Sequence, residues 1–414
     1  QYAYVDSTNN DFALGEVNIG ECGRLSFLDQ GQQLNAEKIL VTGGSDSADL
    51  LPKGQLVIGT EHCPIASSGS QLTLEFKGSR PVDGSANILD GKGILLGSKG
   101  ELVMRGSKGI ADSDPADANG SNSWTYLSIP AGPAVFSDAN GTAVPVPASA
   151  PDTTLTLART VDWQPGDWIA VAGSGFASDQ TEFVQIDDNV TSSGVSVITL
   201  KAATPLKHYH FGSLPPSSGT LAAGTQCNGV TLEGEANISG LPASFCDGAD
   251  RNFGVDERAA VGLNSRSIKL SSDTPASGDD AHDGGQIKLL ASYDTAEIEG
   301  VEIEKFGQDV TNAQPGQTDN VMMSSYPIHY HMVGDSSANT LVNSNSIHHS
   351  YNKCVTLHMS NKATIEHNVC ARAVGHSFYM EDGSEVGNTL KYNLAAGAMA
   401  TQFTPATDAT QFWS

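Results

Sequence analysis

A repeat marked by asparagine is the feature of this sequence that most constrains its fold. Three short apolar runs begin with an asparagine and follow one another at intervals of 23 and 25 residues, at Asn345, Asn368 and Asn393. The strand-like runs that begin at Val355 and Phe378 share the interval of 23 residues. Repeats of about 20 to 50 residues are typical of solenoids, and repeats made only of strands favour a parallel β-helix with the asparagines stacked in a ladder. A large β-sandwich is the alternative, but it does not explain why two different strands share one interval.

Short β-branched runs bounded by Gly, Pro, Ser or Asp occur along the chain and predict strands. Clear examples lie at residues 39–42, 55–59, 71–76, 167–172 and 195–200. The 44 glycines and the 17% share of charged residues suit turns and packed strands better than surface helices. Residues 30–38 form the one segment for which we expect a short helix. We therefore predict an all-β protein.

The net charge excludes several classes of function. Lys and Arg number 22 against 47 Asp and Glu, which gives a formal charge of −25. Binding to nucleic acid or to an anionic membrane surface depends on clustered basic side chains, so we expect neither. No run approaches about 18 consecutive apolar residues, so we predict no membrane span. The nucleophile-elbow, P-loop and dinucleotide-binding motifs are absent from the sequence as well.

Six cysteines and four glycosylation sequons indicate a secreted protein. No two cysteines form a CxxC pair, so disulfides explain them better than a zinc ribbon does. Proximity in the sequence favours the pairs Cys22–Cys63, Cys227–Cys246 and Cys354–Cys370. The sequons are Asn119-Gly-Ser, Asn140-Gly-Thr, Asn189-Val-Thr and Asn237-Ile-Ser. We expect the protein to be extracellular or bound to a cell surface.

Histidines concentrate in the region of the asparagine repeat. His329 and His331 are two residues apart in a strand, so they share one face, which is the outer face if the residues beside them point into the coil. The same alternation places His358 and Glu381 on the outer face of neighbouring coils, which lie about 4.8 Å apart. His376 lies at the rim of this face. The sequence therefore predicts that these side chains converge.

Such a face can hold a metal ion or supply acid and base groups. Imidazole favours zinc or a similar first-row ion, whereas the acidic stretch at residues 279–283 has the oxygen ligands that calcium prefers but is more typical of a turn. The expected metal ligands are His329, His331, His358 and His376. A metal-bound water could then attack a glycosidic bond. The alternative is that each histidine only forms hydrogen bonds on a solvated surface, and we adopt that interpretation for His348, His349 and His367.

Four charged residues complete the expected site. Asp256 and Arg258 share one face of a strand-like run, because one residue separates them. Arg258 is expected to hold a sugar carboxylate through two parallel hydrogen bonds, although a structural ion pair would explain it equally. Glu381 and Asp382 are, with Asp256, the candidates for transferring a proton or for orienting a histidine.

Six motifs, read in order along the chain, resemble one family of extracellular proteins. They are Gln55-Leu-Val-Ile-Gly-Thr-Glu-His-Cys63-Pro, Ser123-Trp-Thr, Trp163-Gln-Pro-Gly-Asp167-Trp-Ile, Arg258-Ala-Ala-Val-Gly-Leu, Tyr326-Pro-Ile-His-Tyr-His331-Met-Val-Gly-Asp335 and Gly375-His376-Ser-Phe-Tyr-Met-Glu381-Asp-Gly383. This family combines an eight-glycine domain with parallel β-helix repeats. Its members include a hyaluronan-binding protein that induces cell migration, a transmembrane relative of that protein, and fibrocystin-like proteins.

The resemblance implies a right-handed, pectate-lyase-like parallel β-helix. Residues 1–250 would form an eight-glycine-type β region with long loop insertions, and residues 251–414 the β-helix repeats. The chain departs from the family where relatives tend to read Arg-Ala-Glu-Val-Gly, because Ala260 stands in place of that glutamate. Residues 408–414 resemble a segment that continues into further coils, so we expect a truncated chain, or an open end capped by another chain or domain.

We therefore expect an extracellular β-helix protein that acts on a glycan. The resemblance favours a glycosidase or lyase that cleaves an acidic, hyaluronan-like polysaccharide, with help from a divalent metal. A non-enzymatic structural or adhesion module of a cell surface or extracellular filament is the alternative. An enzyme needs the histidine face to converge beside an open cleft, whereas a structural module would have these groups dispersed or covered. The charge of −25 opposes a polyanionic substrate unless a basic patch or a bound cation offsets it.

Overall fold

The computed structural model divides the chain into two compact units. The residues that it describes are 2–5, 14–44, 53–66, 71–78, 91–110, 122–133, 135–137, 143–145, 152–174, 177–212, 226–227, 230–231, 258–273, 283–308 and 325–399. The first unit combines residues 1–123 with residues 264–414, and the second consists of residues 124–263. The domain boundary expected at residue 250 stays a prediction. In the sequence, the chain passes from one compact unit to the other after residue 123 and again after residue 263.

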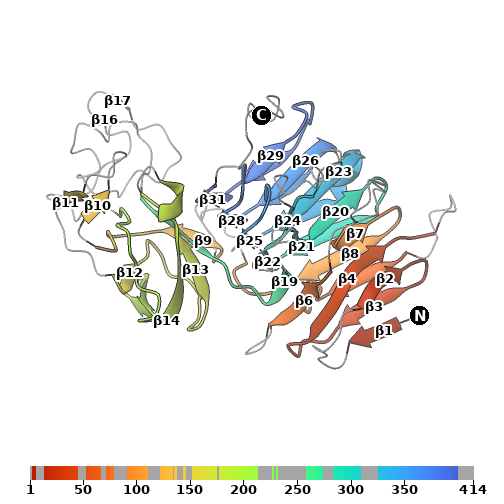
Figure 1. Cartoon of the computed structure of the whole chain (residues 1–414), viewed down its shortest axis with the longest axis horizontal. Coiled ribbons are helices and arrows are strands. Elements are labelled where there is room, and N and C mark those ends of the chain that lie inside the picture. Colours follow the sequence, from red (N-terminus) through yellow and green to blue (C-terminus); the bar gives the residue numbers. More distant parts are fainter. Residues whose placement is uncertain are drawn as a thin grey trace. The chain divides into compact units, whose positions relative to one another are not determined.

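The first unit is a parallel β-helix built from three stacks of strands (Figure 1). The first stack consists of β7 (Gly93–Leu96), β20 (Gln286–Leu290), β23 (Ile328–Gly334), β26 (Val355–Ser360) and β29 (Phe378–Met380). The second consists of β1 (Tyr2–Val5), β3 (Arg24–Phe27), β5 (Gln55–Ile58), β8 (Glu101–Arg105), β21 (Thr295–Glu299), β24 (Thr340–Asn343), β27 (Thr364–Glu366) and β30 (Thr389–Lys391). The third consists of β6 (Leu72–Phe76), β19 (Ile268–Ser272), β22 (Val301–Glu304), β25 (Ser346–His348), β28 (Val369–Ala371) and β31 (Leu394–Ala396).

Each of the last three coils contributes one strand to every stack. Parallel pairing sets Ile328 level with Val355, and Val355 level with Phe378. Because side chains alternate along a strand, every second residue points into the coil, and Ile287, Ile328 and Val355 are almost completely buried there. The all-β class and the parallel β-helix predicted from the repeat are therefore confirmed.

The asparagine ladder is also confirmed. The Oδ1 atom of Asn368 accepts hydrogen bonds of 3.0 Å from both the amide and the Nδ2 of Asn345. The Oδ1 atom of Asn393 accepts the same pair from Asn368. Each Nδ2 also donates to a carbonyl of the preceding coil, for example that of Val342. Asn345 and Asn368 are completely buried, so the ladder satisfies turn amides that water cannot reach.

The prediction of a short helix at residues 30–38 is wrong. Most of this segment belongs to β4 (Gln33–Val41), whose first half pairs with β6 and whose second half pairs with β7. The same strand also pairs with β2 (Leu14–Ile19). Ala36, Ile39 and Val41 are buried while Glu37 is exposed, and this pairing on both sides outweighs the weak helical preference of the segment.

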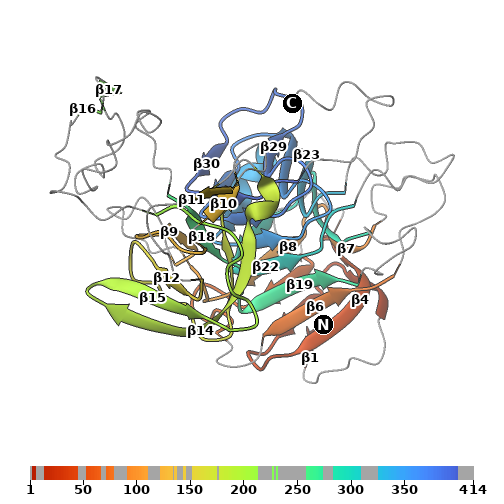
Figure 2. The ribbon, with the colours of Figure 1, turned by 60° about the vertical axis from the view of Figure 1, so that its left-hand side comes forward.

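The second unit contains a six-stranded antiparallel sheet (Figure 2). In spatial order its strands are β12 (Thr154–Thr156), β15 (Val195–Leu200), β14 (Glu182–Ser192), β13 (Trp168–Val171), β18 (Ala260–Leu263) and β9 (Trp124–Tyr126). Two short pairs accompany it, β10 (Val135–Ser137) with β11 (Ala143–Pro145), and β16 (Gln226–Cys227) with β17 (Val230–Thr231). Val171, Ile186 and Val261 lie in its separate apolar core, together with Trp163.

The three expected disulfides have different outcomes. Cys354 and Cys370 are joined, which confirms that pair. Cys22 and Cys63 are both exposed and are not joined to each other, so that pair is wrong. Arg24 lies level with Gln55, so Cys22 precedes the start of β3, whereas Cys63 follows the far end of β5. The pair Cys227–Cys246 depends on a residue outside those that the structure describes.

Among the described residues, no helix has the length and apolar character needed to cross a membrane.

Candidate functional site

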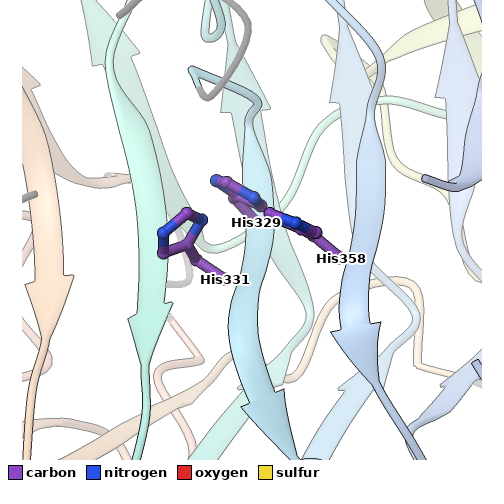
Figure 3. A group of neighbouring side chains, drawn as sticks. All are labelled: His329, His331 and His358. Atoms are coloured by element: carbon purple, nitrogen blue, oxygen red, sulfur yellow. The ribbon is translucent and has the colours of Figure 1, made fainter. Parts of the chain in front are cut away.

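Three histidines meet on the outer surface of the first stack of strands. His329 and His331 alternate along β23 with the inward-pointing Ile328 and Tyr330, and both of these inner side chains are completely buried. His358 lies on β26, directly level with His331 in the parallel pairing. The three rings lie on one side of these neighbouring strands (Figure 3). The coil register therefore brings together residues that are up to 29 positions apart in the sequence.

The three imidazoles form a compact group. The ring centres of His329 and His331 lie 4.9 Å apart, and those of His331 and His358 lie 5.1 Å apart. His329 and His358 stack almost in parallel at 6.2 Å. One nitrogen of each ring lies within 4.8 Å of the others, close enough for one metal ion to recruit all three with small rotations. His329 is fully buried, whereas His358 and His331 are partly exposed.

The electrostatics keep His331 neutral. Burial, together with the positive charges of Lys288 and His358, lowers the pKa of His331 to about 4. Its Nδ1 atom is buried and has no hydrogen-bond partner within the described part of the chain. A neutral imidazole nitrogen of this kind can bind a metal or accept a proton. Lys288, which is level with His329 on β20, opposes any added cation.

Two carboxylates lie beside His358. Glu381 follows β29 and occupies the position that corresponds to His331 and His358 on the next coil. Its Oε2 atom lies 3.9 Å from Nδ1 of His358, and an Oδ2 atom of Asp382 lies 3.6 Å from Nε2 of the same ring. Burial raises the pKa of Glu381, although His358, Tyr326 and Lys353 counteract this increase. Glu381 therefore keeps a proton at higher pH than an ordinary glutamate does.

Tyr326, Lys353 and Tyr379 belong to this surface but were not among the residues expected from the sequence. The hydroxyl of Tyr326 donates to Oε1 of Glu381 at 3.2 Å, and its ring packs edge-on against His329. The Nζ atom of Lys353 lies 5.3 Å from the ring centre of Tyr326 and 4.4 Å from that of Tyr379. Burial lowers the pKa of Lys353, while the charge of Glu381 raises it.

The repeat in the sequence contains information that could have identified two of these residues, Tyr326 and Lys353. Because Ile328, Val355 and Phe378 are level, the residues two places before them are level too, and these are Tyr326, Lys353 and His376. His376 lies at this edge, exposed and stacked on Tyr379 with ring centres 5.1 Å apart. Among the described residues, it is not part of the group formed by His329, His331 and His358.

The remaining expected site residues belong to other parts of the chain. Arg258 belongs to the second unit, where its guanidinium carbon lies 5.0 Å from the ring centre of Tyr126. Its expected role toward the sugar stays a prediction, as does that of Asp256, which lies outside the described residues. His282 and the rest of the acidic stretch 279–282 also lie outside them, whereas the carboxylate of Asp283 accepts a hydrogen bond from Gln308.

One of the four expected glycosylation sites lies in the described part of the chain. The Nδ2 atom of Asn189, which would carry the glycan, donates hydrogen bonds to the carbonyls of Val161 and Trp163 at 3.1 and 2.9 Å. A glycan would replace one of these hydrogens, so attachment requires that the segment around Asn189 rearranges. The asparagines of the other three sequons are Asn119, Asn140 and Asn237, which are not described.

Comparison with known proteins identifies two regions of the chain. Residues 2–111 match the G8 domain, and residues 282–413, which contain the histidine group, match the CEMIP beta-helix. Together the two matches cover more than half of the chain.

Three relatives illustrate these similarities. Fibrocystin-L of Homo sapiens is 26% identical over 438 residues, a match that covers 95% of this chain and 9% of that protein. The cell migration-inducing and hyaluronan-binding protein of Mus musculus is 28% identical over 260 residues, or 58% of this chain and 15% of that protein. The cell surface hyaluronidase CEMIP2 of Homo sapiens is 31% identical over 156 residues, or 34% of this chain and 10% of that protein. The matched part of this chain thus covers less than a fifth of the length of each of these three relatives.

Proposed function

Because the chain belongs to the family that combines a G8 domain with a CEMIP beta-helix, we propose that it acts outside the cell or at a cell surface on an acidic polysaccharide of the hyaluronan type. Two relatives carry hyaluronan in their names, one as a binding protein and one as a hyaluronidase. The match to the beta-helix model includes all the residues of the histidine group. The surface formed by this group is accordingly the proposed site of action.

The proposed cofactor is a first-row divalent ion such as zinc, held by His329, His331 and His358. The observation that carries this proposal is the convergence of their ring nitrogens within 4.8 Å. The low pKa of His331 supports it, because that nitrogen needs no deprotonation before it binds. Glu381 and Asp382 beside His358 would orient its ring and offset the charge of Lys288. The ion would supply Lewis acidity and an activated water.

Side chains beside the proposed ion would bind the sugar and transfer the proton. Lys353 lies between the rings of Tyr326 and Tyr379 and can pair with a sugar carboxylate, while the partly exposed ring of Tyr379 offers an apolar face to the sugar. Glu381, whose pKa is raised, can donate a proton to the leaving sugar oxygen, and Tyr326 holds its carboxyl group in place. A local cation and Lys353 would also offset the net charge of −25, which otherwise repels a polyanion.

The test measures the chain length of hyaluronan after incubation with the protein, with and without a chelator. We expect the wild-type protein to shorten the polymer, and we expect the chelator, His331→Ala or His358→Ala to reduce the rate by at least about 100-fold. His62→Ala, which changes an exposed histidine in a turn of the first unit, is the matched control and should keep the wild-type rate.

Two results would contradict this function. Full activity of both variants would remove the histidine group from the mechanism. If the wild-type protein binds hyaluronan but does not cleave it, the proposed catalytic activity is contradicted. That result would favour the adhesion module, which is the alternative that the sequence leaves open.

A further inference from the structure

A second group of ligating side chains lies on a different stack of the β-helix. Glu304 ends β22 and His348 ends β25, and the two residues are level in the parallel pairing. His349 follows directly, and one ligand atom of each of the three residues lies within 4.8 Å of the others. The interpretation of His348 as a histidine on a solvated surface is wrong, because its side chain is only 7% exposed.

The charge on Glu302 determines which nitrogen of His348 carries the proton. The Nζ atom of Lys269 lies 2.7 Å from Oε1 of this carboxyl group, and its Oε2 atom accepts a hydrogen bond of 3.2 Å from the backbone amide of Arg266. Glu302 is therefore ionised, so its carboxylate oxygens accept hydrogen bonds and donate none. Its Oε1 atom lies 3.3 Å from Nε2 of His348, so that nitrogen carries the hydrogen. The remaining lone pair of a neutral His348 is then on Nδ1.

The lone pair of His348 faces the neighbouring histidine. The Nδ1 atoms of His348 and His349 lie only 2.9 Å apart. At this distance one Nδ1 atom carries a hydrogen and the other carries a lone pair, because two N–H groups facing each other would repel. In the metal-free protein one Nδ1 donates its hydrogen to the other. If the hydrogen of His349 moves to its Nε2 atom, two lone pairs converge on one point.

We propose that Glu304, His348 and His349 form a second site for a first-row divalent ion, separate from the site on the first stack. Metal–nitrogen bonds of about 2.0–2.1 Å to two atoms that are 2.9 Å apart enclose an angle of about 90°, which is the angle between adjacent ligands in octahedral or square-planar coordination. Glu304 would provide the third ligand from the neighbouring coil. The two imidazoles favour nickel, copper or zinc over calcium and magnesium.

The surroundings of the group have the features of an outer ligand shell. Glu302 accepts the hydrogen of His348 on the side away from the proposed ion, an arrangement that fixes the tautomer of a metal-binding histidine. Lys269 lies 2.7 Å from both Glu302 and Glu304, so it orients the two carboxylates and limits their repulsion. Lys305 and Arg372 also add positive charge near His349, which makes the affinity moderate.

The ion would have a structural role. Glu304 belongs to one coil of the β-helix, whereas His348 and His349 belong to the next. A shared ion would therefore join two successive coils at the end of β25. The site needs neither a sugar nor the first histidine group, so it is independent of the proposed function.

The experiment counts metal ions per chain by elemental analysis, after the full chain is loaded with nickel or zinc and dialysed. It uses the His331→Ala background, in which the first site is disabled. We expect close to one ion per chain in this background and none after His349→Ala is added. His367→Ala is the matched control, because His367 has a similar left-handed backbone and stacks on Tyr392 outside both groups. It should leave the ion count unchanged.

A second variant keeps the test valid if His349→Ala does not fold. Glu304→Gln preserves the shape of the side chain and removes its charge, and we expect it to weaken binding of the added metal at least 10-fold in the same background. The proposal is overturned if the His331→Ala protein retains no ion, or if both His349→Ala and Glu304→Gln retain as much metal as the His367→Ala control.

Discussion

At the scale of single residues, two buried tyrosines differ in one hydrogen bond. The hydroxyl of Tyr293 bonds to the hydroxyl of Thr340, whereas the hydroxyl of Tyr330 is buried without a hydrogen-bond partner within the described part of the chain. Burial raises the pKa of Tyr330 far above its ordinary value, so the group stays a neutral hydroxyl. An unsatisfied buried hydroxyl costs stability, while a satisfied one contributes to it.

We therefore predict opposite effects for two conservative substitutions. Tyr330→Phe should raise the free energy of unfolding by about 1 kcal/mol, and Tyr293→Phe should lower it by about 1 kcal/mol. Thermal unfolding of the two variants beside the wild-type protein measures both effects. Shifts of both variants in the same direction would contradict this interpretation of the two hydroxyls.

The candidate site shows how far single residues can be predicted from the repeat. His331, His358 and Glu381 occupy one position in three successive coils, and the interval of 23 residues between the last two was visible in the sequence. The complete burial of His329 was not visible, because it depends on how neighbouring side chains pack over the strand. The prediction did not include Lys353, because the repeat was defined by its apolar positions and was not extended to the residues that precede each strand.

At the scale of strands and coils, the one confirmed disulfide joins two strands of a single coil. Cys354 lies immediately before β26 and Cys370 lies in β28, and both side chains are completely buried in the apolar core. The bond closes a segment of 16 residues. A link over a segment of this length restricts the unfolded chain and stabilises the folded state by about 3 kcal/mol.

The double variant Cys354→Ala/Cys370→Ala should accordingly lose about 3 kcal/mol of stability, and a reducing agent should have no further effect on it. Denaturant titration in oxidising and reducing buffer provides the measurement. Cys63→Ala, at an exposed position, is the control and should behave like the wild-type protein. A wild-type protein that is equally stable in both buffers would contradict the assigned role of the bond.

The fold was predictable from the sequence only where the coils are regular. The last coils repeat at 23 and 25 residues, which is why the asparagine ladder could be placed. Between β20 and β23 the level residues Ile287 and Ile328 are 41 positions apart, so no constant interval marks that coil. The segment at β4 was misassigned because its pairing with β6 and β7 involves strands distant in the sequence, which local preferences do not reveal.

At the scale of the whole molecule, acid should destabilise the second unit through the buried carboxyl group of Glu182. Glu182 in the second unit accepts hydrogen bonds from the amides of Lys207 and His208 and from His210. Burial alone would raise its pKa, but these hydrogen bonds hold the pKa of Glu182 below its ordinary value of 4.5. The unfolded chain therefore takes up this proton first, so the stabilisation is complete above about pH 4.5 and is lost as the pH falls through the folded pKa.

Calorimetry tests this prediction. We expect two unfolding transitions, of which the one that belongs to the second unit moves to lower temperature as the pH falls from about 6 to about 3. Glu182→Gln should destabilise that transition by about 2 kcal/mol near neutral pH, reduce its dependence on acid and leave the other transition in place. A single transition that the substitution shifts as a whole would contradict the independence of the two units.

We propose that the register of the coils assembles a metal centre from His329, His331 and His358. The decisive measurement is anomalous diffraction at the zinc absorption edge, from crystals of the full chain grown with zinc. We predict one anomalous peak about 2.0–2.1 Å from a nitrogen of each of the three rings. Well-ordered imidazoles without any peak between them at saturating zinc would contradict the claim, whatever the other histidine group binds.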